Sequence, residues 1–409
     1  MSSYLAYVLL AWSLWATRGH FEPKGIAGLA VAWALAAFPN RGKVPPWLPW
    51  AFSLFFSYWI LRDMRLLYVL PKWEKHLRGL ALLASVGYLL QPKWRAVGLG
   101  LALAGLIDID LFIPLASPDP KIDVFVASKE AIQFFLQGKP VYSGGYSEIY
   151  GGRYGYEPGF NYWPGVLSYL VPFQSLTGDF RWGLVAAHLI SVGILFRWVS
   201  LSVALLWLSF PVVPFVLEQS WNEPLLAMLL FLFYLCASRK KMDWAAVFLG
   251  ILLGSKQYLI PLGLLSLLWI YRQHGKQKFL RVSAISLGVA TLLLLPFLIR
   301  EPVGLVHTTI TKVLQFPYRE DSLNFTTFLT LCGLGVLNPL RYLVLVGVFG
   351  WTIYKIYQVP DEKTWAWSSF FFYFTLFTFG NHAFCNYYYW VAGLATLHLA
   401  LLPKPLSRS

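Results

Sequence analysis

Apolar segments recur along almost the whole chain and are separated by short polar or proline-rich stretches. Segments of this kind predict helices that cross a membrane or lie in it. Several of those in the first 90 residues are shorter than the roughly 20 residues that a full span needs. The predicted helices fall near residues 4–17, 25–38, 47–60, 79–90, 96–113, 183–196, 199–217, 224–237, 243–256, 258–271, 279–298, 340–357, 364–380 and 387–402.

The helix predicted near residues 96–113 is the clearest span. Lys93 and Arg95 precede it and acidic residues follow it. The positive-inside rule therefore places its start in the cytoplasm and the long polar loop after it on the outer side. Basic loops at residues 238–243 and 271–281 are expected on the cytoplasmic side, as is the C-terminal tail.

Three segments depart from this simple alternation. Residues 61–78 are basic and amphipathic, which is typical of a helix that lies in the membrane interface. Residues 165–176 and 325–337 are short and interrupted by Pro, Gly or Cys. Counting either as a full span would place the basic loops outside, so both are predicted to be juxtamembrane or re-entrant helices on the outer face.

The composition indicates that the solvent of this protein is partly lipid. Hydrophobic residues make up 57% of the 409 residues and charged residues 13%, whereas soluble domains contain about 25% charged residues. Aromatic residues make up 18% and suit the two membrane interfaces. The predicted fold class is therefore an all-α polytopic membrane protein, with membrane lipids as partners.

The net charge of +14 is explained by Lys and Arg held near anionic lipid on the cytoplasmic side. No basic run interleaves with a soluble domain, which argues against nucleic acid as a partner. Cys236, Cys332 and Cys385 form no CxxC and have no His at a metal-ligand spacing, so they predict no metal site. The first apolar segment lacks a basic leader and an A-x-A site, and we expect it to remain as a membrane helix.

Acidic residues gather around the predicted outer loop. Asp108 and Asp110 form a DxD at the end of one helix, and Asp123 begins a short amphipathic helix that ends at Gly138. Asp123 has two interpretations. Its carboxylate either caps the helix by accepting hydrogen bonds from free N–H groups, or it serves as a general base at the membrane surface.

Tyrosines follow this helix in a glycine-rich loop. Such rings either stack on sugars or form part of an interfacial belt. The loop tyrosines are Tyr142, Tyr146, Tyr150, Tyr154, Tyr156 and Tyr162.

Cationic residues from later loops are predicted on the same side of the membrane as Asp123. Lys256, Arg319 and His382 are candidates to hold a phosphate, which needs such donors at a low-dielectric boundary. Each also has a structural interpretation. Lys256 would snorkel, Arg319 would pair with an acidic neighbour in its Arg-Glu-Asp sequence, and His382 would be a neutral interfacial histidine.

Five motifs in order resemble one group of membrane enzymes. They are IDVFVASKEAIQFFLQGKPVYS from residue 122, WNEP from 221, KQYLIP from 256, REDSLN from 319 and HAFCNYYYW from 382. Over roughly residues 95–402 the chain resembles the GT-C fold glycosyltransferases, and most closely the polyprenyl-phosphate-sugar-dependent, mannosyltransferase-like enzymes of family 87. Residues 1–92 have no counterpart in that resemblance.

The resemblance implies an inverting transfer of a hexose, most commonly mannose, from a polyprenyl-phosphate sugar to a lipid or glycan acceptor at the outer face of the plasma membrane. It implies that Asp123 is the base and that Lys256, Arg319 and His382 hold the donor phosphate. It also implies a GT-C domain over residues 93–409, with juxtamembrane helices in the outer loop 114–182, preceded by extra helices over 1–92. No cofactor is expected. The candidate substrate-binding residues are Glu223, Gln257, Tyr258, Asn386, Tyr387, Tyr142 and Tyr156.

Two alternatives to this assignment stay open. Some GT-C enzymes use a DxD in the first outer loop, and Asp108 and Asp110 fit that string; a divalent metal would then be expected. Positions i and i+2 of a helix point to different faces, which favours Asp123. The other alternative is that the protein has no bond chemistry and is a lipid or solute transporter, a flippase, or a partner-binding subunit. The polar motifs on one side and the absence of an internal repeat in the sequence favour the enzyme.

Overall fold

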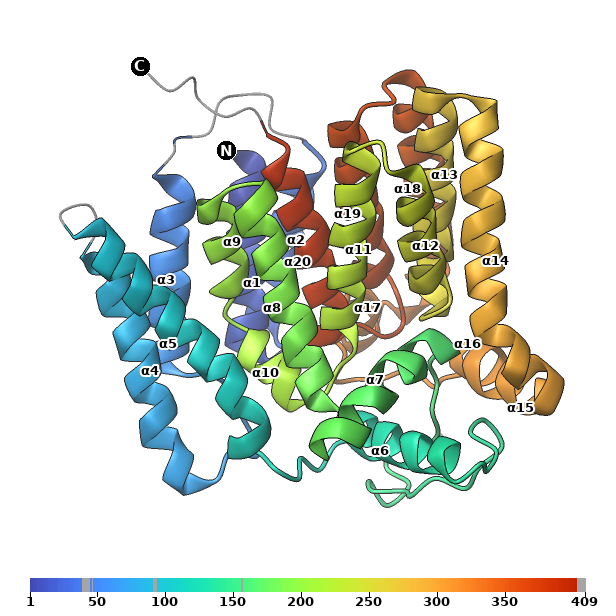
Figure 1. Ribbon diagram of the computed structural model, residues 1–409, viewed down its shortest axis with the longest axis horizontal. Coiled ribbons are helices and arrows are strands. Elements are labelled where there is room, and N and C mark those ends of the chain that lie inside the picture. The colour runs from blue at the N-terminus through green and yellow to red at the C-terminus, as the bar shows by residue number, and fades with distance from the viewer. Residues whose placement is uncertain (39–44, 46, 91–93, 156, 403–409) are drawn as a thin grey trace. The chain divides into compact units, whose positions relative to one another are not determined.

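The computed structural model describes residues 1–38, 45, 47–90, 94–155 and 157–402 (Figure 1). These residues form helices and loops, with no strand among them beyond one isolated bridge between His20 and Ser322. The chain divides into two compact units. Unit 1 comprises residues 1–118, 189–218 and 319–409, and unit 2 comprises residues 119–188 and 219–318.

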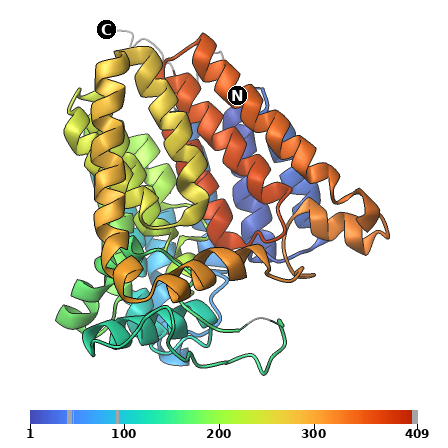
Figure 2. The same cartoon turned by 90° about the vertical axis from the view of Figure 1, so that its right-hand side faces the viewer.

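Unit 1 is built mainly from the two ends of the chain. α1 packs on α2, and α4 packs on α5. α19 packs between α18 and α20, and α20 also packs on α1. Figure 2 shows α18 and α19 side by side. The helices of unit 1 are α1 (Ser2–Thr17), α2 (Pro23–Ala36), α3 (Leu48–Arg62), α4 (Pro71–Leu89), α5 (Arg95–Ala116), α9 (Leu201–Leu208), α10 (Val213–Glu218), α17 (Phe325–Leu331), η3 (Gly335–Leu337), α18 (Leu340–Gln358), α19 (Glu362–Thr378) and α20 (Cys385–Ala400).

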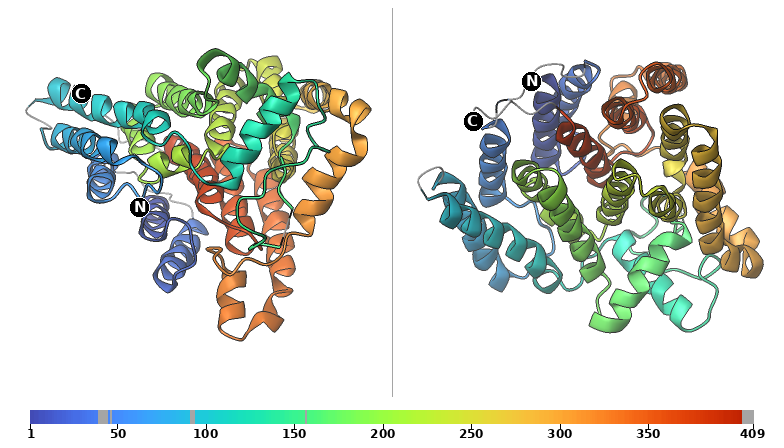
Figure 3. Two further views of the ribbon diagram at one scale, coloured as in Figure 1. Left: turned by 90° about the horizontal axis from the view of Figure 1, so that it is seen from below. Right: turned by 45° about the horizontal axis from the view of Figure 1, so that its top comes forward.

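Unit 2 combines the long loop with a group of apolar helices. α12 packs between α11 and α14, and α6 lies against α7 (Figure 3). α8 (Arg181–Trp198) begins in unit 2 and ends in unit 1. The other helices of unit 2 are α6 (Asp123–Leu136), α7 (Pro164–Thr177), α11 (Glu223–Ser238), α12 (Met242–Leu253), η1 (Gln257–Leu259), α13 (Ile260–His274), α14 (Lys276–Arg300), α15 (Pro302–Val306), the π-helical η2 (His307–Thr311) and α16 (Lys312–Leu314).

Three of the described helical segments are long and apolar enough to cross a membrane: residues 96–116, 276–300 and 335–358. The helices α7 and α8 meet at 112° across a short break. They would make a fourth candidate span if the two together are one broken span. Only 6% of the apolar window that includes α18 is buried inside the protein, and Leu343 and Val346 on it are largely exposed. An exposed apolar surface of this kind is typical of a helix that faces lipid.

Most of the predicted helices are confirmed, but two segments were predicted wrongly. The segment 199–217 is two helices, α9 and α10, because Pro211 follows the end of α9 at Leu208 and cannot donate the next backbone hydrogen bond. The amphipathic segment 61–78 is not one helix either. α3 ends at Arg62 and α4 begins at Pro71, which occupies the first helical turn where its missing N–H costs nothing.

The two predicted outer-face helices are both short in the structure. Residues 165–176 form α7, which turns sharply into α8, and residues 325–337 form α17 followed by η3. η3 belongs to the same apolar stretch as α18, so the second short segment leads directly into a candidate span. Lys93, the tail after residue 402 and the side chain of Arg95 lie outside the described residues, as does Tyr156.

The loop between α3 and α4 is held in unit 1 by a buried carboxylate. Glu218, which is fully buried at the end of α10, accepts hydrogen bonds from the backbone N–H groups of Leu67 (2.9 Å) and Tyr68 (2.8 Å). The N–H of Leu70 donates to the carbonyl of Ala116 at the end of α5. Three backbone N–H groups of this loop are therefore satisfied by two helix ends.

The helices α4 and α5 form a tight antiparallel pair through glycine (Figure 1). A Cβ atom placed on Gly105 of α5 would lie 2.5 Å from the carbonyl oxygen of Leu80 on α4. A Cβ atom placed on Gly87 of α4 would likewise lie 2.5 Å from the carbonyl oxygen of Gly98 on α5. Small residues that let two backbones approach closely are the usual means of packing helices in lipid.

We therefore expect Gly105→Ala to destabilise the protein by about 1–3 kcal/mol, because the new methyl group must push the two backbones apart. Gly100→Ala is the matched control, since Gly100 lies on the same helix with no atom within 4 Å of an added Cβ. Thermal unfolding of the purified protein in detergent measures both changes. A Gly105→Ala protein as stable as the Gly100→Ala protein would contradict the close packing.

Candidate functional site

The first residue of α6 is Asp123, and its half-buried carboxylate is held by local hydrogen bonds. Its Oδ1 accepts from the N–H of Val124 at 2.8 Å and lies 3.4 Å from the hydroxyl of Tyr150. That hydroxyl also accepts from the N–H of Asp123 at 3.2 Å. The N-cap is Ile122, and no side chain caps this helix. Asp123 is therefore the first helical residue rather than the N-cap, and its carboxylate accepts from one free N–H of the first turn as well as lying beside the hydroxyl of Tyr150.

Tyr150 is itself fixed by a tight turn in the tyrosine-rich loop. The carboxylate of Glu148 accepts hydrogen bonds from the N–H groups of Tyr150 (2.7 Å) and Gly152 (2.8 Å), and these bonds lower the pKa of Glu148. The ring of Tyr154 packs edge-on against Tyr150 with centroids 4.9 Å apart. Tyr150 is thus a further candidate residue beside Asp123, and the sequence did not distinguish it from the other loop tyrosines.

The beginning of the loop is anchored by a second buried carboxylate, Glu301. It accepts hydrogen bonds from three successive backbone N–H groups, those of Val141 (2.9 Å), Tyr142 (2.7 Å) and Ser143 (3.0 Å). Tyr142 is buried, donates from its hydroxyl to the carbonyl of Tyr162 at 2.9 Å, and has its pKa raised by burial. Its ring is therefore enclosed by protein and holds the two ends of the loop together.

A buried ion pair joins two of the predicted site residues in unit 2. The Nζ of Lys256 lies 2.5 Å from Oε1 of Glu223, and their side chains are 4% and 0% exposed. Tyr258 donates from its hydroxyl to the same oxygen at 3.2 Å. The rings of Tyr162 and Tyr258 lie 4.6 and 5.2 Å from Nζ, which allows cation–π contact. Lys256 does not snorkel to the surface, because Glu223 already balances its charge.

Local structure explains why Glu223 and Lys256 meet. Glu223 is the first residue of α11, and Lys256 follows the end of α12 in extended conformation. Because α11 and α12 are neighbours joined by a short turn, the start of one lies beside the end of the other. When both groups are buried, their mutual attraction offsets a desolvation penalty that either charge alone would not overcome.

Gln257 connects this pair to the loop and to η2. Its amide donates to the carbonyl of Thr309 at 2.8 Å, and Trp163 donates from its indole to the hydroxyl of the same threonine at 3.1 Å. The N–H of Trp163 also bonds to the carbonyl of Ser255. π-helical turns such as η2 are frequent at functional sites. The end of the tyrosine-rich loop is thus attached to the segment that carries Lys256.

Other predicted residues lie in unit 1. Arg319 makes two hydrogen bonds to Asp321, with Nε to Oδ1 and Nη2 to Oδ2 both at 2.7 Å. The predicted ion pair of Arg319 is therefore confirmed, with Asp321 as the partner. The guanidinium also lies 4.9 Å from the ring centre of Phe384. The half-buried His382 is two residues from Phe384 on the same segment.

The segments that carry Arg319 and His382 are hydrogen-bonded to each other. The N–H of Leu323 donates to the carbonyl of Ala383 at 2.9 Å, and the N–H of Ala383 donates to the hydroxyl of Ser322 at 2.7 Å. Two motifs 60 residues apart therefore form one local structure. Asn386 is buried at the start of α20, and the ring of Tyr387 packs on Phe377 with centroids 4.8 Å apart.

Asp108 and Asp110 both lie inside α5. Asp110 is buried, whereas Asp108 is half-buried, as expected for positions i and i+2 of a helix. In the part of the chain that the structure describes, no three His, Cys, Asp or Glu residues gather closely enough to hold a metal ion. The two carboxylates of the DxD string therefore lie in different environments on α5.

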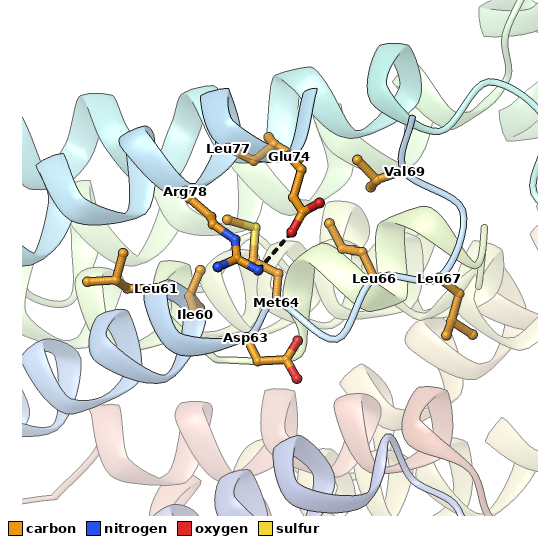
Figure 4. Close-up of a pocket in the computed structure, with 10 residues that line it drawn as sticks. All are labelled: Ile60, Leu61, Asp63, Met64, Leu66, Leu67, Val69, Glu74, Leu77 and Arg78. Carbon is orange, nitrogen blue, oxygen red and sulfur yellow. Dashed lines mark hydrogen bonds and ion pairs between the residues drawn. The ribbon is translucent and has the colours of Figure 1, made fainter. Parts of the chain in front are cut away.

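A cavity of about 220 Å³ lies in unit 1 between the end of α3 and the start of α4. Its wall is mostly aliphatic, with Asp63, Glu74 and Arg78 as its charged members. Figure 4 shows the carboxylates of Asp63 and Glu74 on opposite sides of the guanidinium of Arg78, which donates to Glu74 at 2.7 Å. None of the predicted site residues lines this cavity.

The predicted site residues therefore form separate local groups. Asp123 lies with Tyr150, and Glu223, Lys256 and Tyr258 lie together in unit 2, whereas Arg319, His382, Asn386 and Tyr387 belong to unit 1. That Asp123 meets Arg319 and His382 in one site remains a prediction. Comparison of the chain with protein-family models, with curated proteins and with solved structures gave no match.

The buried pair gives a direct stability test. Glu223→Gln and Lys256→Met should each lower the free energy of unfolding by about 3–5 kcal/mol, because each leaves one buried charge without its counterion. The double variant should lose much less than the sum of the two losses. Chemical denaturation in detergent micelles measures all three proteins.

Asp243→Asn in the exposed pair with Arg281 is the matched control and should change stability little. Additive losses in the Glu223→Gln/Lys256→Met double variant would show that the two charges do not depend on each other.

Proposed function

We propose that the protein is a membrane glycosyltransferase of the GT-C fold, which moves a hexose from a polyprenyl-phosphate sugar to a lipid or glycan acceptor at the outer face of the plasma membrane. The observation that carries the proposal is the Asp123 carboxylate, half-buried at the start of an amphipathic helix and held by Tyr150 in a long tyrosine-rich loop. A general base needs this combination of fixed orientation and access. The ordered motifs that resemble family 87 support the same reaction.

In the proposed reaction Asp123 accepts the proton of an acceptor hydroxyl as that oxygen attacks the anomeric carbon of the sugar. A new glycosidic C–O bond forms, and the bond between the anomeric carbon and the phosphate oxygen breaks. Its electron pair leaves with the lipid phosphate, and the configuration of the sugar inverts. Cationic groups around the phosphate stabilise the charge that develops on it, and Arg319 and His382 remain the candidates.

The surroundings of Lys256 in the structure lead us to revise its proposed role. Its ammonium group is buried and already paired with Glu223, so binding a phosphate would first require that pair to separate. We therefore assign Lys256 and Glu223 to the support of the tyrosine-rich loop, because Tyr162 and Tyr258 pack against Nζ. Gln257 acts with them by holding Thr309.

A transporter or flippase is the second candidate, and the same ion pair is the observation that favours it. Buried ionisable residues and broken helices are common in transporters, and α7 meets α8 at 112°. A flux assay in proteoliposomes distinguishes the two. Movement of a lipid-linked sugar without any glycosidic product would favour transport.

For the enzyme, Asp123→Asn should retain the fold and lower the rate of sugar transfer by about 10²–10⁴-fold, because the amide cannot accept the proton. Transfer from a radiolabelled polyprenyl-phosphate sugar measures the rate, and thermal unfolding checks the fold.

Glu130→Gln is the matched control for this change. Glu130 lies on the same helix and accepts two hydrogen bonds from Ser147 in the same loop. The Glu130→Gln change should weaken the hydrogen bonds to Ser147 in the loop while leaving the Asp123 carboxylate in place. Full transfer by the Asp123→Asn protein, or equal loss in both variants, would remove Asp123 from the proposed mechanism.

A further inference from the structure

We propose that the turn between α1 and α2 completes a phosphate-binding site in unit 1, with Arg18 and His20 beside Arg319. The chemical class of ligand is a phosphate group, carried by a lipid or free in solution. The lipid-borne form rests on the proposed function, in which a polyprenyl phosphate is the donor and the leaving group. The segment that supplies the two new residues is the part of the chain that has no counterpart in the family resemblance.

The turn is attached to the Arg319 segment by its backbone. His20 and Ser322 form an antiparallel bridge, and the N–H of Phe21 donates to the carbonyl of Asp321 at 2.9 Å. Gly19 has φ +72°, and a Cβ atom there would lie 2.3 Å from the backbone nitrogen of Cys385. Only glycine fits this contact, so the turn is held against the start of α20 as well.

Arg18 differs from the other partly buried arginines of the protein. Among the described arginines that are at least partly buried, Arg65, Arg181 and Arg319 each pair with a carboxylate, and Arg341 donates to Asn381 and to Tyr342. Within the described ranges, the guanidinium of Arg18 has no ion pair or hydrogen bond, and its Nε is buried. Arg18 also holds the left-handed conformation, with φ 55°, which is uncommon for a residue with a side chain. A cation that is partly desolvated without a counterion creates a site that favours an anion.

The charges of the groups beside Arg18, which are Arg319, Asp321 and His20, nearly cancel one another. Arg319 is neutralised by Asp321, and Nδ1 of His20 lies 3.8 Å from Oδ2 of the same aspartate. The ring of Phe384 contacts both His20 and Arg319. The positive charge of Arg18 is therefore left over, at a place where the imidazole and a second guanidinium are already positioned.

His20 is suited to respond to an anion. Partial burial of the imidazole, whose side chain is 47% exposed, lowers its pKa; Asp321 opposes this, and the charges of Arg319 and Arg18 lower it further. The imidazole is consequently neutral near pH 7 in the free protein and can offer one N–H. A bound phosphate would favour the protonated form, because an opposite charge nearby raises a histidine pKa. Arginine is the residue that matches phosphate geometry best, through paired N–H donors.

The site is tested by binding to the full-length protein in detergent, without any sugar transfer. Arg18→Asn is the main variant, since Asn tolerates the left-handed conformation and removes the charge. Its affinity for a short-chain polyprenyl phosphate should fall about tenfold or more, as for the loss of one charged hydrogen bond. His20→Asn should weaken binding as well, and Lys24→Gln, which alters the exposed pair with Glu22, should leave it unchanged.

Inorganic phosphate, tested as a competitor, distinguishes the two ligand sources. Competition that Arg18→Asn abolishes supports a site for phosphate itself, and binding of the lipid without such competition supports a site for the lipid-borne group. Equal affinity of the wild-type, Arg18→Asn and His20→Asn proteins for both probes would overturn the proposal. Asp123→Asn should bind both probes normally. Its transfer activity tests the proposed base separately, because normal transfer would refute the base while the phosphate site would still be judged by binding alone.

Discussion

The need to compensate buried charge organises both units of this protein. Glu218, Glu223 and Glu301 are carboxylates with 0–7% exposure in a chain made largely of apolar helices. Each is compensated by groups from a distant part of the sequence: the N–H groups of Leu67 and Tyr68, the ammonium of Lys256, or three N–H groups of the tyrosine-rich loop. Because an uncompensated carboxylate would cost several kcal/mol, each one determines where a loop meets a helix.

This constraint separates structural charges from charges that are available to a ligand. Lys256 is buried and paired, so its strongest contribution is to the packing of Tyr162 and Tyr258 around Glu223. Asp123 is half-buried, and its carboxylate accepts from the N–H of Val124 and lies beside the hydroxyl of Tyr150. Arg18 is partly buried and has no counterion among the described residues. The proposed function and the proposed phosphate site use the second kind of charge.

The N-terminal helices form part of the architecture of unit 1. α1 packs on α20, α3 packs on α9, and the turn after α1 is bridged to the segment that carries Arg319. A division of the chain at residue 92 therefore does not coincide with a unit of the structure, in which residues 1–118 are grouped with the C-terminal helices. The tertiary contacts give this segment a place beside Arg319, whereas the resemblance gave it no role.

The sequence by itself determined which residues are helical and where most helices end, because apolar length, Pro and Gly act locally. It also placed Asp123 at the start of a short helix and predicted the pairing of Arg319 within its own segment, since both depend on near neighbours. The tertiary structure decided that Lys256 meets Glu223, that Tyr150 orients Asp123, and that His20 lies beside Asp321. These contacts join residues 27 to 301 positions apart, and no local pattern of hydrophobicity or charge specifies which distant partner a polar group will find.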